Sequence, residues 1–185
     1  MKRTRLRLGA YPKRATLTDG REVSIRPLQP SDRAELLRFF RAIPAADRQL
    51  LHHDVTDPAL VERWAAHADY FRALPLVAES NGRIVGDGVL IRGLGRARAH
   101  TGLVRALVAT PFRNKGLVEA LLAALCGVAD GAELSPVFVE VVPGRDEELE
   151  RAARRLGFRK AASIPRSVRL ASGSPRDVVL LSRQS

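Results

Sequence analysis

The sequence predicts a mixed α/β domain, in which strands and helices follow one another in the order βααα-ββ-βαβα-ββ. Three observations indicate this fold class. Short segments either alternate polar and apolar residues or are continuously apolar, as strands are. Longer segments repeat apolar residues at helical spacing. Residues 103–125 join an apolar run to an amphipathic helix through a short basic turn that contains Gly116.

The composition fits one domain. The chain has 185 residues, enough to bury a sizeable core, and 45% of them are apolar. No apolar run is long enough to span a membrane and no signal-peptide pattern opens the sequence, so we expect a cytoplasmic protein with no membrane partner. The single cysteine, Cys126, excludes a disulfide framework or a cysteine metal site within one chain. No other cluster has metal-ligand spacing, so we predict no metal.

The net charge of +11 raises the question of a nucleic-acid partner. Only four of the 31 basic residues are lysines, and this skew, with the abundant alanine, is typical of a protein from a GC-rich bacterial genome. Aromatic residues, on which bases would stack, make up only 5% of the chain. We therefore rank a basic nucleic-acid-binding domain last among the functions considered.

Basic residues are dense only at the N-terminus, where residues 2–14 carry six of them. We predict that residues 1–18 form a basic, flexible tail and that residues 19–185 form a single domain. The alternative for the tail is an arm that contacts an acidic partner.

The first strand is expected at residues 22–26, where polar and apolar side chains alternate. Asp32 and Glu35, three residues apart, predict a capping box for the helix that follows. A second helical piece is expected at residues 44–51. A third begins at Asp57, because proline is favoured at the first helical position.

A β-hairpin follows the helices. Asn81-Gly82 lies between two apolar segments and predicts a type I′ turn, since both residues accept positive φ angles. The two strands are expected at residues 75–79 and 84–91. Gly86 and Gly88 in the return strand predict a bulge or a close approach by another element.

The central segment is a strand, a turn and a helix. Such an arrangement directs backbone N–H groups and the positive end of a helix dipole at one spot, which favours phosphate binding. Arg113 and Lys115 add positive charge beside that spot. The helix presents one apolar face, made by Leu117, Leu121, Leu122, Leu125 and Val128.

The C-terminal part is predicted to contain a strand at residues 136–142 and a helix at residues 147–156. Gly157 is the expected left-handed cap of this helix. Two last strands are expected around residues 167–170 and 178–181, with a turn between them.

Several of these segments resemble one family. Arg113-Asn114-Lys115-Gly116-Leu117-Val118 resembles the Arg/Gln-x-x-Gly-x-Gly/Ala signature of GNAT-type N-acetyltransferases. Gly82-Arg83-Ile84-Val85-Gly86 and Leu156-Gly157-Phe158 resemble the hairpin and the later helix end of the same family. Residues 19–27, followed by Phe39-Phe40-Arg41, are similar to the branch that includes bacterial protein-lysine acetyltransferases.

The resemblance implies a mostly antiparallel, mixed sheet of six to seven strands flanked by helices. It also implies an acyl-CoA N-acyltransferase with acetyl-CoA as co-substrate and an amine as acceptor. By resemblance, the thioester carbonyl meets a backbone N–H of Leu107 or Val108. The pyrophosphate lies against the turn residues Arg113, Asn114, Lys115, Gly116, Leu117 and Val118. Val118 departs from the signature, because its larger side chain stands where the family has Gly or Ala.

Two side chains that the family often uses for catalysis are missing. Leu103 stands at the position of the usual glutamate base, and Ala153 at that of the usual tyrosine acid. Glu140 on a neighbouring strand is the first candidate base, His100 at the head of the central strand is the second, and Glu79 is the third. For each of them, the alternative is an exposed strand residue in a salt bridge.

Two functions of the resembled fold stay open from the sequence. The first is an N-acetyltransferase that acts on a protein lysine or a small amine. The alternative is a catalytically degenerate domain that binds a CoA thioester as a sensor or interaction module. A homodimer is also left open.

The acceptor site is the least specified part of the prediction. A cationic acceptor would need acidic residues, and Asp54, Asp57, Glu79 and Asp87 are available. The adjacent His52 and His53, with Asp54 and Trp64, are further substrate-contact candidates. Core packing is the preferred interpretation of Trp64.

Overall fold

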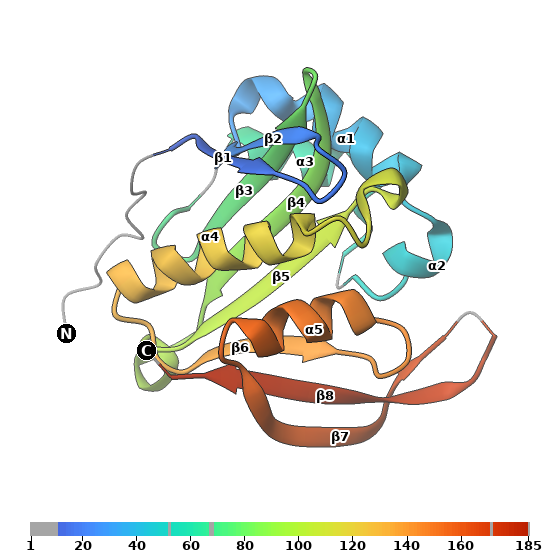
Figure 1. Cartoon of the computed structure of the whole chain (residues 1–185). Helices are drawn as coiled ribbons and strands as arrows, with labels where there is room; N and C mark the ends of the chain where they lie inside the picture. Colours follow the sequence, from blue (N-terminus) through green and yellow to red (C-terminus); the bar gives the residue numbers. More distant parts are fainter. Residues whose placement is uncertain (1–10, 52, 67–68, 171, 185) are drawn as a thin grey trace.

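The computed structural model describes residues 11–51, 53–66, 69–170 and 172–184. One sheet of eight strands crosses the molecule in the order β1-β2-β3-β4-β5-β6-β8-β7. All neighbouring strands are antiparallel except β5 and β6, which are parallel. The structure thus confirms the mixed α/β class and the mostly antiparallel sheet flanked by helices (Figure 1).

The strands are β1 (Lys13–Thr16), β2 (Glu22–Pro27), β3 (Ala73–Ser80), β4 (Arg83–Arg92), β5 (Gly102–Val108), β6 (Val137–Val141), β7 (Arg159–Arg169) and β8 (Pro175–Arg183). The α-helices are α1 (Arg33–Ala42), α2 (Ala45–Arg48), α3 (Pro58–Ala66), α4 (Leu117–Gly131) and α5 (Glu147–Arg155). Short 3₁₀ turns lie at Pro30–Asp32, Arg96–Arg98 and Thr110–Phe112. The predicted order of elements is therefore correct, apart from one added strand at the start.

The added strand is β1, which explains why the sheet has eight strands instead of six to seven. It lies within the segment predicted to be a flexible tail and pairs with β2 from Lys13–Ile25 to Thr16–Glu22. The sequence pattern did not predict this strand, because residues 13 and 14 are both basic. The tail's earlier residues, 1–10, lie outside the described residues.

Helices cover both faces of the sheet. Figure 1 shows α4 and α5 on one face and α1 and α3 on the other. The first face encloses the larger core, which includes Leu121 and Leu125 of α4. The second encloses a smaller core in which Phe39 and Phe40 of α1 pack with Val61 of α3 and Val77 of β3.

The glycines of β4 let α4 approach the sheet. A Cβ atom on Gly86 would lie 3.0 Å from Leu121 Cδ1, and one on Gly88 would lie 3.0 Å from Leu125 Cδ1. The predicted close approach is therefore observed here. The predicted bulge is observed beside it, because the consecutive β3 residues Ala78 and Glu79 pair with Gly86 and Ile84 and leave Val85 of β4 as the extra residue.

The hairpin and the glycine cap form as predicted. Asn81 and Gly82 have φ angles of 50° and 72°, and Gly157 ends α5 with a φ of 90°. The expected capping box of α1 does not form, because the Asp32 carboxylate accepts a hydrogen bond from Gln29 N at 2.8 Å and binds Arg26. Asp32 therefore closes the turn before α1 instead of capping the helix through Glu35.

The last two strands are longer than predicted. β7 begins at Arg159, directly after the cap of α5, and β8 begins at Pro175. Their hairpin is irregular, with register shifts between Lys160 and Ala162 and between Ile164 and Val168. The parts not predicted are residues 159–166 of β7 and 175–177 of β8, where basic, small and proline residues interrupt any alternation of polar and apolar side chains.

Candidate active site

Two neighbouring strands separate in the middle of the sheet. β5 pairs with β4 along its whole length, from Gly102 to Val108. It pairs with β6 only at Gly102–Val137 and Leu103–Phe138. Beyond Leu103 a cavity of about 250 Å³ opens between β5 and β6.

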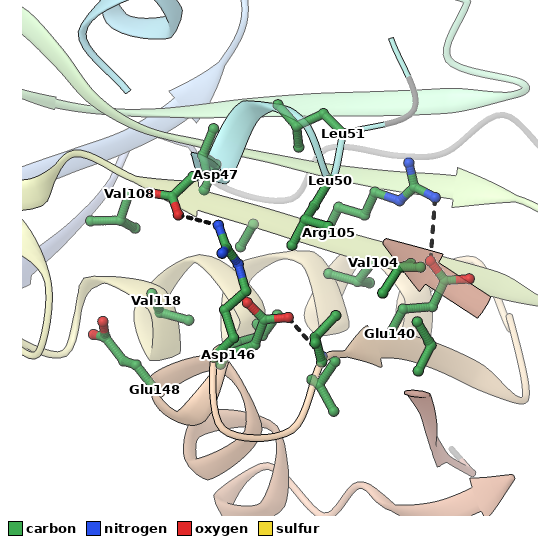
Figure 2. A pocket seen from close by; sticks show the side chains of 18 of the residues that line it. Asp47, Leu50, Leu51, Val104, Arg105, Val108, Val118, Glu140, Asp146 and Glu148 are labelled. Carbon is green, nitrogen blue, oxygen red and sulfur yellow. Dashed lines mark hydrogen bonds and ion pairs between the residues drawn. The ribbon is translucent and has the colours of Figure 1, made fainter. Parts of the chain in front are cut away.

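The cavity runs around the free edge of β5, because side chains from both faces of this strand line it. Val104, Ala106 and Val108 face α4, whereas Arg105 and Leu107 face the side of α1 and α2. The remaining lining residues are Asp47, Leu50, Leu51, Arg113, Val118, Glu140, Val141, Val142, Arg145, Asp146, Glu148, Leu149, Val168 and Val178. Figure 2 shows these side chains converging from α2, β5, β6 and the start of α5.

The register between β4 and β5 tells which backbone groups point into the cavity. Ala109 N donates a hydrogen bond to Val85 O at 2.9 Å, and Gly102 N donates to Pro136 O at 3.1 Å. N–H groups alternate between the two edges of an antiparallel strand. The Ala106 and Val108 N–H groups therefore face the gap toward β6, whereas the Leu107 N–H faces β4. Of the two predicted amide donors, the register favours Val108, and Leu107 contributes its side chain.

The turn before α4 has the backbone of an anion site. Gly116 is the N-cap residue with a φ of 87°, and no side chain caps the helix. The N–H groups of the first helical turn have no partner within an α-helix. Apart from its chain neighbours, no described residue lies within 4 Å of the position that a Gly116 Cβ would take. Asn114 also adopts a left-handed conformation, with a φ of 55°.

The polar side chains of the turn point in different directions. Arg113 donates to Asp47 Oδ2 at 2.7 Å through Nη2 and to Val108 O at 3.3 Å through Nε. Asn114 Oδ1 accepts a hydrogen bond from Arg151 at 3.1 Å. Lys115 is half-buried, and its backbone oxygen accepts from Thr18 N at 3.1 Å.

The two apolar residues of the turn are buried. Leu117 is fully buried in the core under the sheet, so only its backbone can face a ligand. Val118 is 6% exposed and forms part of the cavity wall. Val118, the residue that departs from the family signature, therefore has its side chain in the wall between the turn and the gap beside β5.

The structure brings one of the three candidate bases into the cavity. Glu140 of β6 lines the cavity, and its Oε2 lies 3.5 Å from Arg105 Nη2 (Figure 2). Burial lowers the pKa of Arg105, an effect that the charge of Glu140 partly offsets. Glu140 is thus a partly exposed carboxylate next to a half-buried guanidinium.

The other two candidates lie elsewhere. His100 is exposed, precedes β5 and is not among the cavity residues. Glu79 accepts hydrogen bonds from Arg26 at 2.7 and 2.9 Å, in a cluster that also contains the buried Asp32. This cluster holds β2, β3 and the start of α1 together, which gives Glu79 a structural environment away from the cavity.

Three acidic residues of the cavity were not predicted as site residues. Asp47 of α2 binds both Arg113 and Arg145. Asp146 accepts a hydrogen bond from Val142 N at 2.7 Å, and its burial raises its pKa, to which the charge of Asp47 contributes. Glu148 Oε1 is buried and has no hydrogen-bond partner among the described residues. The sequence signals only Asp146, as the N-cap of α5.

The acidic residues suggested for a cationic acceptor do not line the cavity. Asp87 pairs with the cavity residue Leu107 across β4 and β5. Burial raises its pKa to about 7. Trp64 packs against Phe40 with ring centroids 6.2 Å apart, consistent with core packing, and against His53 at 5.7 Å. His52 lies outside the described residues.

No helix among the described residues is both long and apolar enough to cross a membrane. Within the same part of the chain, no group of three or more His, Cys, Asp or Glu residues is arranged to hold a metal ion.

Solved structures with the same fold are acetyltransferases. The GNAT domain of S. lividans PAT has a TM-score of 0.73 and 20% identity, covering 95% of this chain and 100% of that one. yncA from Salmonella typhimurium, solved with its cofactor acetyl-CoA, has a TM-score of 0.73 and 20% identity, covering 88% and 93%. An N-acetyltransferase from Staphylococcus aureus Mu50 has a TM-score of 0.75 and 14% identity, covering 88% and 98%.

Sequence comparison gives the family. No curated protein matches the chain. The family model described as "Acetyltransferase (GNAT) family" matches residues 37–158, a segment that contains both the divergent strands and the turn before α4. The chain belongs to the GNAT family of acetyltransferases.

Proposed function

We propose that the protein transfers the acetyl group of acetyl-CoA to an amine, either a protein lysine or the amine of a small molecule, in the cavity between β5 and β6. The enzyme class and the acetyl donor follow from the family. The observation that supports this site is the separation of β5 from β6 beyond Leu103, next to the uncapped N-terminus of α4.

The site offers binding groups for two parts of acetyl-CoA, the pantetheine arm and the pyrophosphate. The free edge of β5 offers the Ala106 and Val108 backbone groups to the amides of the pantetheine arm, as a partner strand would. The first-turn N–H groups of α4 suit the pyrophosphate, because they carry the positive end of the helix dipole. Lys115 adds a cation beside them, whereas Arg113 becomes available only when it leaves Asp47.

In this proposal the Val108 N–H donates a hydrogen bond to the thioester oxygen. Negative charge develops on that oxygen when the amine attacks the carbonyl carbon, so a fixed donor stabilises the transition state more than the ground state. The C–S bond then breaks, the thiolate takes a proton from water, and the nitrogen of the new amide gives its excess proton to the hydroxide that is left. Water is the proposed acid because Ala153, at the position of the usual tyrosine, is fully buried and has no acidic group.

Glu140 is the proposed base. It accepts the proton that the ammonium group of the acceptor must lose before attack, directly or through one water molecule. It lines the cavity from β6, opposite Arg105, which precedes Val108 by three residues on β5. His100, the second sequence candidate, lies outside the cavity, so the proposal rests on Glu140.

Calorimetric titration with acetyl-CoA tests the donor site. We expect the native protein to bind and Gly116→Trp to lose binding, because the indole would fill the space in front of α4. Gly82→Trp is a matched control, since Gly82 also has a positive φ, of 72°, and open space around it. Absence of binding by the native protein, or equal loss in both variants, would contradict the proposed site.

A thiol-release assay with a panel of amines then tests turnover. Acetyl-CoA consumption that depends on the amine supports the transferase. Binding without turnover on lysine peptides, small amines and amino acids would instead favour a domain that only senses the CoA thioester.

A further inference from the structure

A second hollow adjoins the cavity. It is lined by Val142, Pro143, Gly144, Arg145, Leu170 and Arg176. It shares Val142 and Arg145 with the cavity and contains no residue of the turn that precedes α4. The hollow therefore lies on the side of the β6–α5 loop and the β7–β8 hairpin, away from the proposed pyrophosphate site.

Arg176 reaches the hollow from β8. It pairs with Val168 across the hairpin, and alternation puts it on the same face as Val178, two residues later. Val168 and Val178 both line the cavity, so this face of the hairpin is turned toward it. The side chain of Arg176 is exposed and forms no hydrogen bond or ion pair with the described residues. The adjacent Asp177 lies on the opposite face and accepts a hydrogen bond from Arg166 N at 2.9 Å.

Arg145 reaches the hollow from the loop before α5. Its Nη2 donates to Asp47 Oδ1 and to Ala46 O, and these bonds leave Nη1 and Nε for another acceptor. No carboxylate of the described residues lines the hollow. Two arginines, of which Arg145 is also bound to Asp47, thus line it together with Val142, Pro143, Gly144 and Leu170.

This chemistry selects an anion. Guanidinium groups bind carboxylates through paired, charge-assisted hydrogen bonds. A carboxylate held there would lie next to the part of the cavity formed by Val168 and Val178, away from the turn proposed for the pyrophosphate of the donor.

We propose that this hollow is a subsite for a carboxylate of the acceptor, and that the enzyme therefore prefers amines that carry a carboxylate near the reacting nitrogen. The inference rests on the proposed function of the cavity. The carboxylate has two sources, the α-carboxylate of a free amino acid or an Asp or Glu side chain beside a lysine in a peptide.

Steady-state kinetics with paired acceptors tests the proposal and separates the sources. One pair is a lysine peptide with a neighbouring Asp and the same peptide with Asn. The other is a set of free amino acids and their amides. The native protein is compared with Arg176→Gln. Arg159→Gln is the control, because Arg159 is an exposed arginine at the far end of the same hairpin, where it pairs with Ser182.

We expect the carboxylate-bearing member of at least one pair to have the lower KM. In Arg176→Gln its KM should rise about tenfold with little change in kcat. The amide or Asn member and the Arg159→Gln variant should be unaffected. An equal effect on both members of each pair, or no effect, would overturn the proposal.

The donor's own phosphate is the competing occupant. If Arg176→Gln weakens binding of acetyl-CoA but not of its 3′-dephospho form, the subsite belongs to the donor and the proposal is wrong. Binding of the paired acceptors is also measured without acetyl-CoA. If the native protein binds the carboxylate-bearing member more tightly and Arg176→Gln does not, the subsite is supported even if no turnover is detected. If the native protein binds both members of each pair equally, the subsite is refuted, whereas the proposed function of the cavity is not.

Discussion

Arg113 of the turn before α4 donates a hydrogen bond to Asp47 of α2 at 2.7 Å, and Arg145 binds the other oxygen of the same carboxylate. One acidic side chain thereby connects the proposed pyrophosphate turn, the β6–α5 loop and the helical segment that covers the cavity. It also neutralises the arginine that the sequence signature offers to the pyrophosphate.

Asp47→Asn should increase the affinity for acetyl-CoA. The substitution removes a negative charge from the cavity wall and frees the Arg113 guanidinium for the pyrophosphate, so we expect the Kd to fall about threefold to tenfold. Calorimetry measures the change. Glu62→Gln, which breaks an exposed ion pair with Arg33 away from the cavity, is the control. A higher Kd would show that Asp47 supports the site instead of competing for it.

Val118→Ala should bind acetyl-CoA more tightly and be less stable. The smaller side chain opens the space between the turn and β5, while the lost burial costs about 2 kcal/mol of unfolding free energy. Val128→Ala, buried on the same helix but outside the cavity, should lose similar stability without gaining affinity. Equal affinities in the two variants would mean that Val118 does not obstruct the donor.

Glu140→Gln should lower kcat about a hundredfold or more, because the amide cannot accept the ammonium proton. The Kd for acetyl-CoA should stay the same. Raising the pH should partly restore the rate, since more of the acceptor amine is then already deprotonated. Glu147→Gln, an exposed glutamate at the start of α5, is the control. Full activity in Glu140→Gln would exclude this residue as the base.

Asp87→Asn should stabilise the protein above neutral pH. Burial raises the pKa of Asp87 to about 7, so the native state holds a proton that the unfolded state loses near pH 4. The contribution of Asp87 to the free energy of unfolding is therefore fully present at low pH and falls as the pH rises from about 4 to 7. Because the side chain is partly exposed, we expect the variant to gain about 2 kcal/mol at pH 8 and little at pH 4.

Urea denaturation of Asp87→Asn at several pH values checks this expectation. Asp54→Asn is the control with the opposite sign, because the Thr56 hydroxyl and backbone N–H lower the pKa of Asp54. A pH-independent difference between the native protein and Asp87→Asn would contradict the raised pKa.

Local signals made much of the fold predictable. Asn81-Gly82 determined a hairpin because few other residue pairs accept two positive φ angles, and Gly116 marked the start of α4 for a similar reason. β1 was missed because its pattern is basic and only its pairing with β2 makes it a strand. The hydrogen bonds of Asp32 were also unpredictable, since Arg26 lies in another element.

The site was predictable only where backbone geometry defines it. The turn at residues 113–118 is local, and the structure places it beside the cavity. Asp47 and Arg145 meet through tertiary packing across 98 residues of chain, and nothing in the surrounding sequence indicates either partner. The separation of β5 and β6 is likewise a property of the assembled sheet, so the sequence suggests the strands but not the gap.

The open edge of β5 has a further consequence for the unliganded molecule. A strand edge with unpaired backbone groups can pair with a strand of another chain, and proteins usually protect such edges. Here the unpaired part lies inside the sheet, between β5 and β6, instead of at one of its outer edges. The backbone groups that this separation leaves unpaired can bind an extended ligand that carries amides of its own, such as the pantetheine arm of the proposed donor.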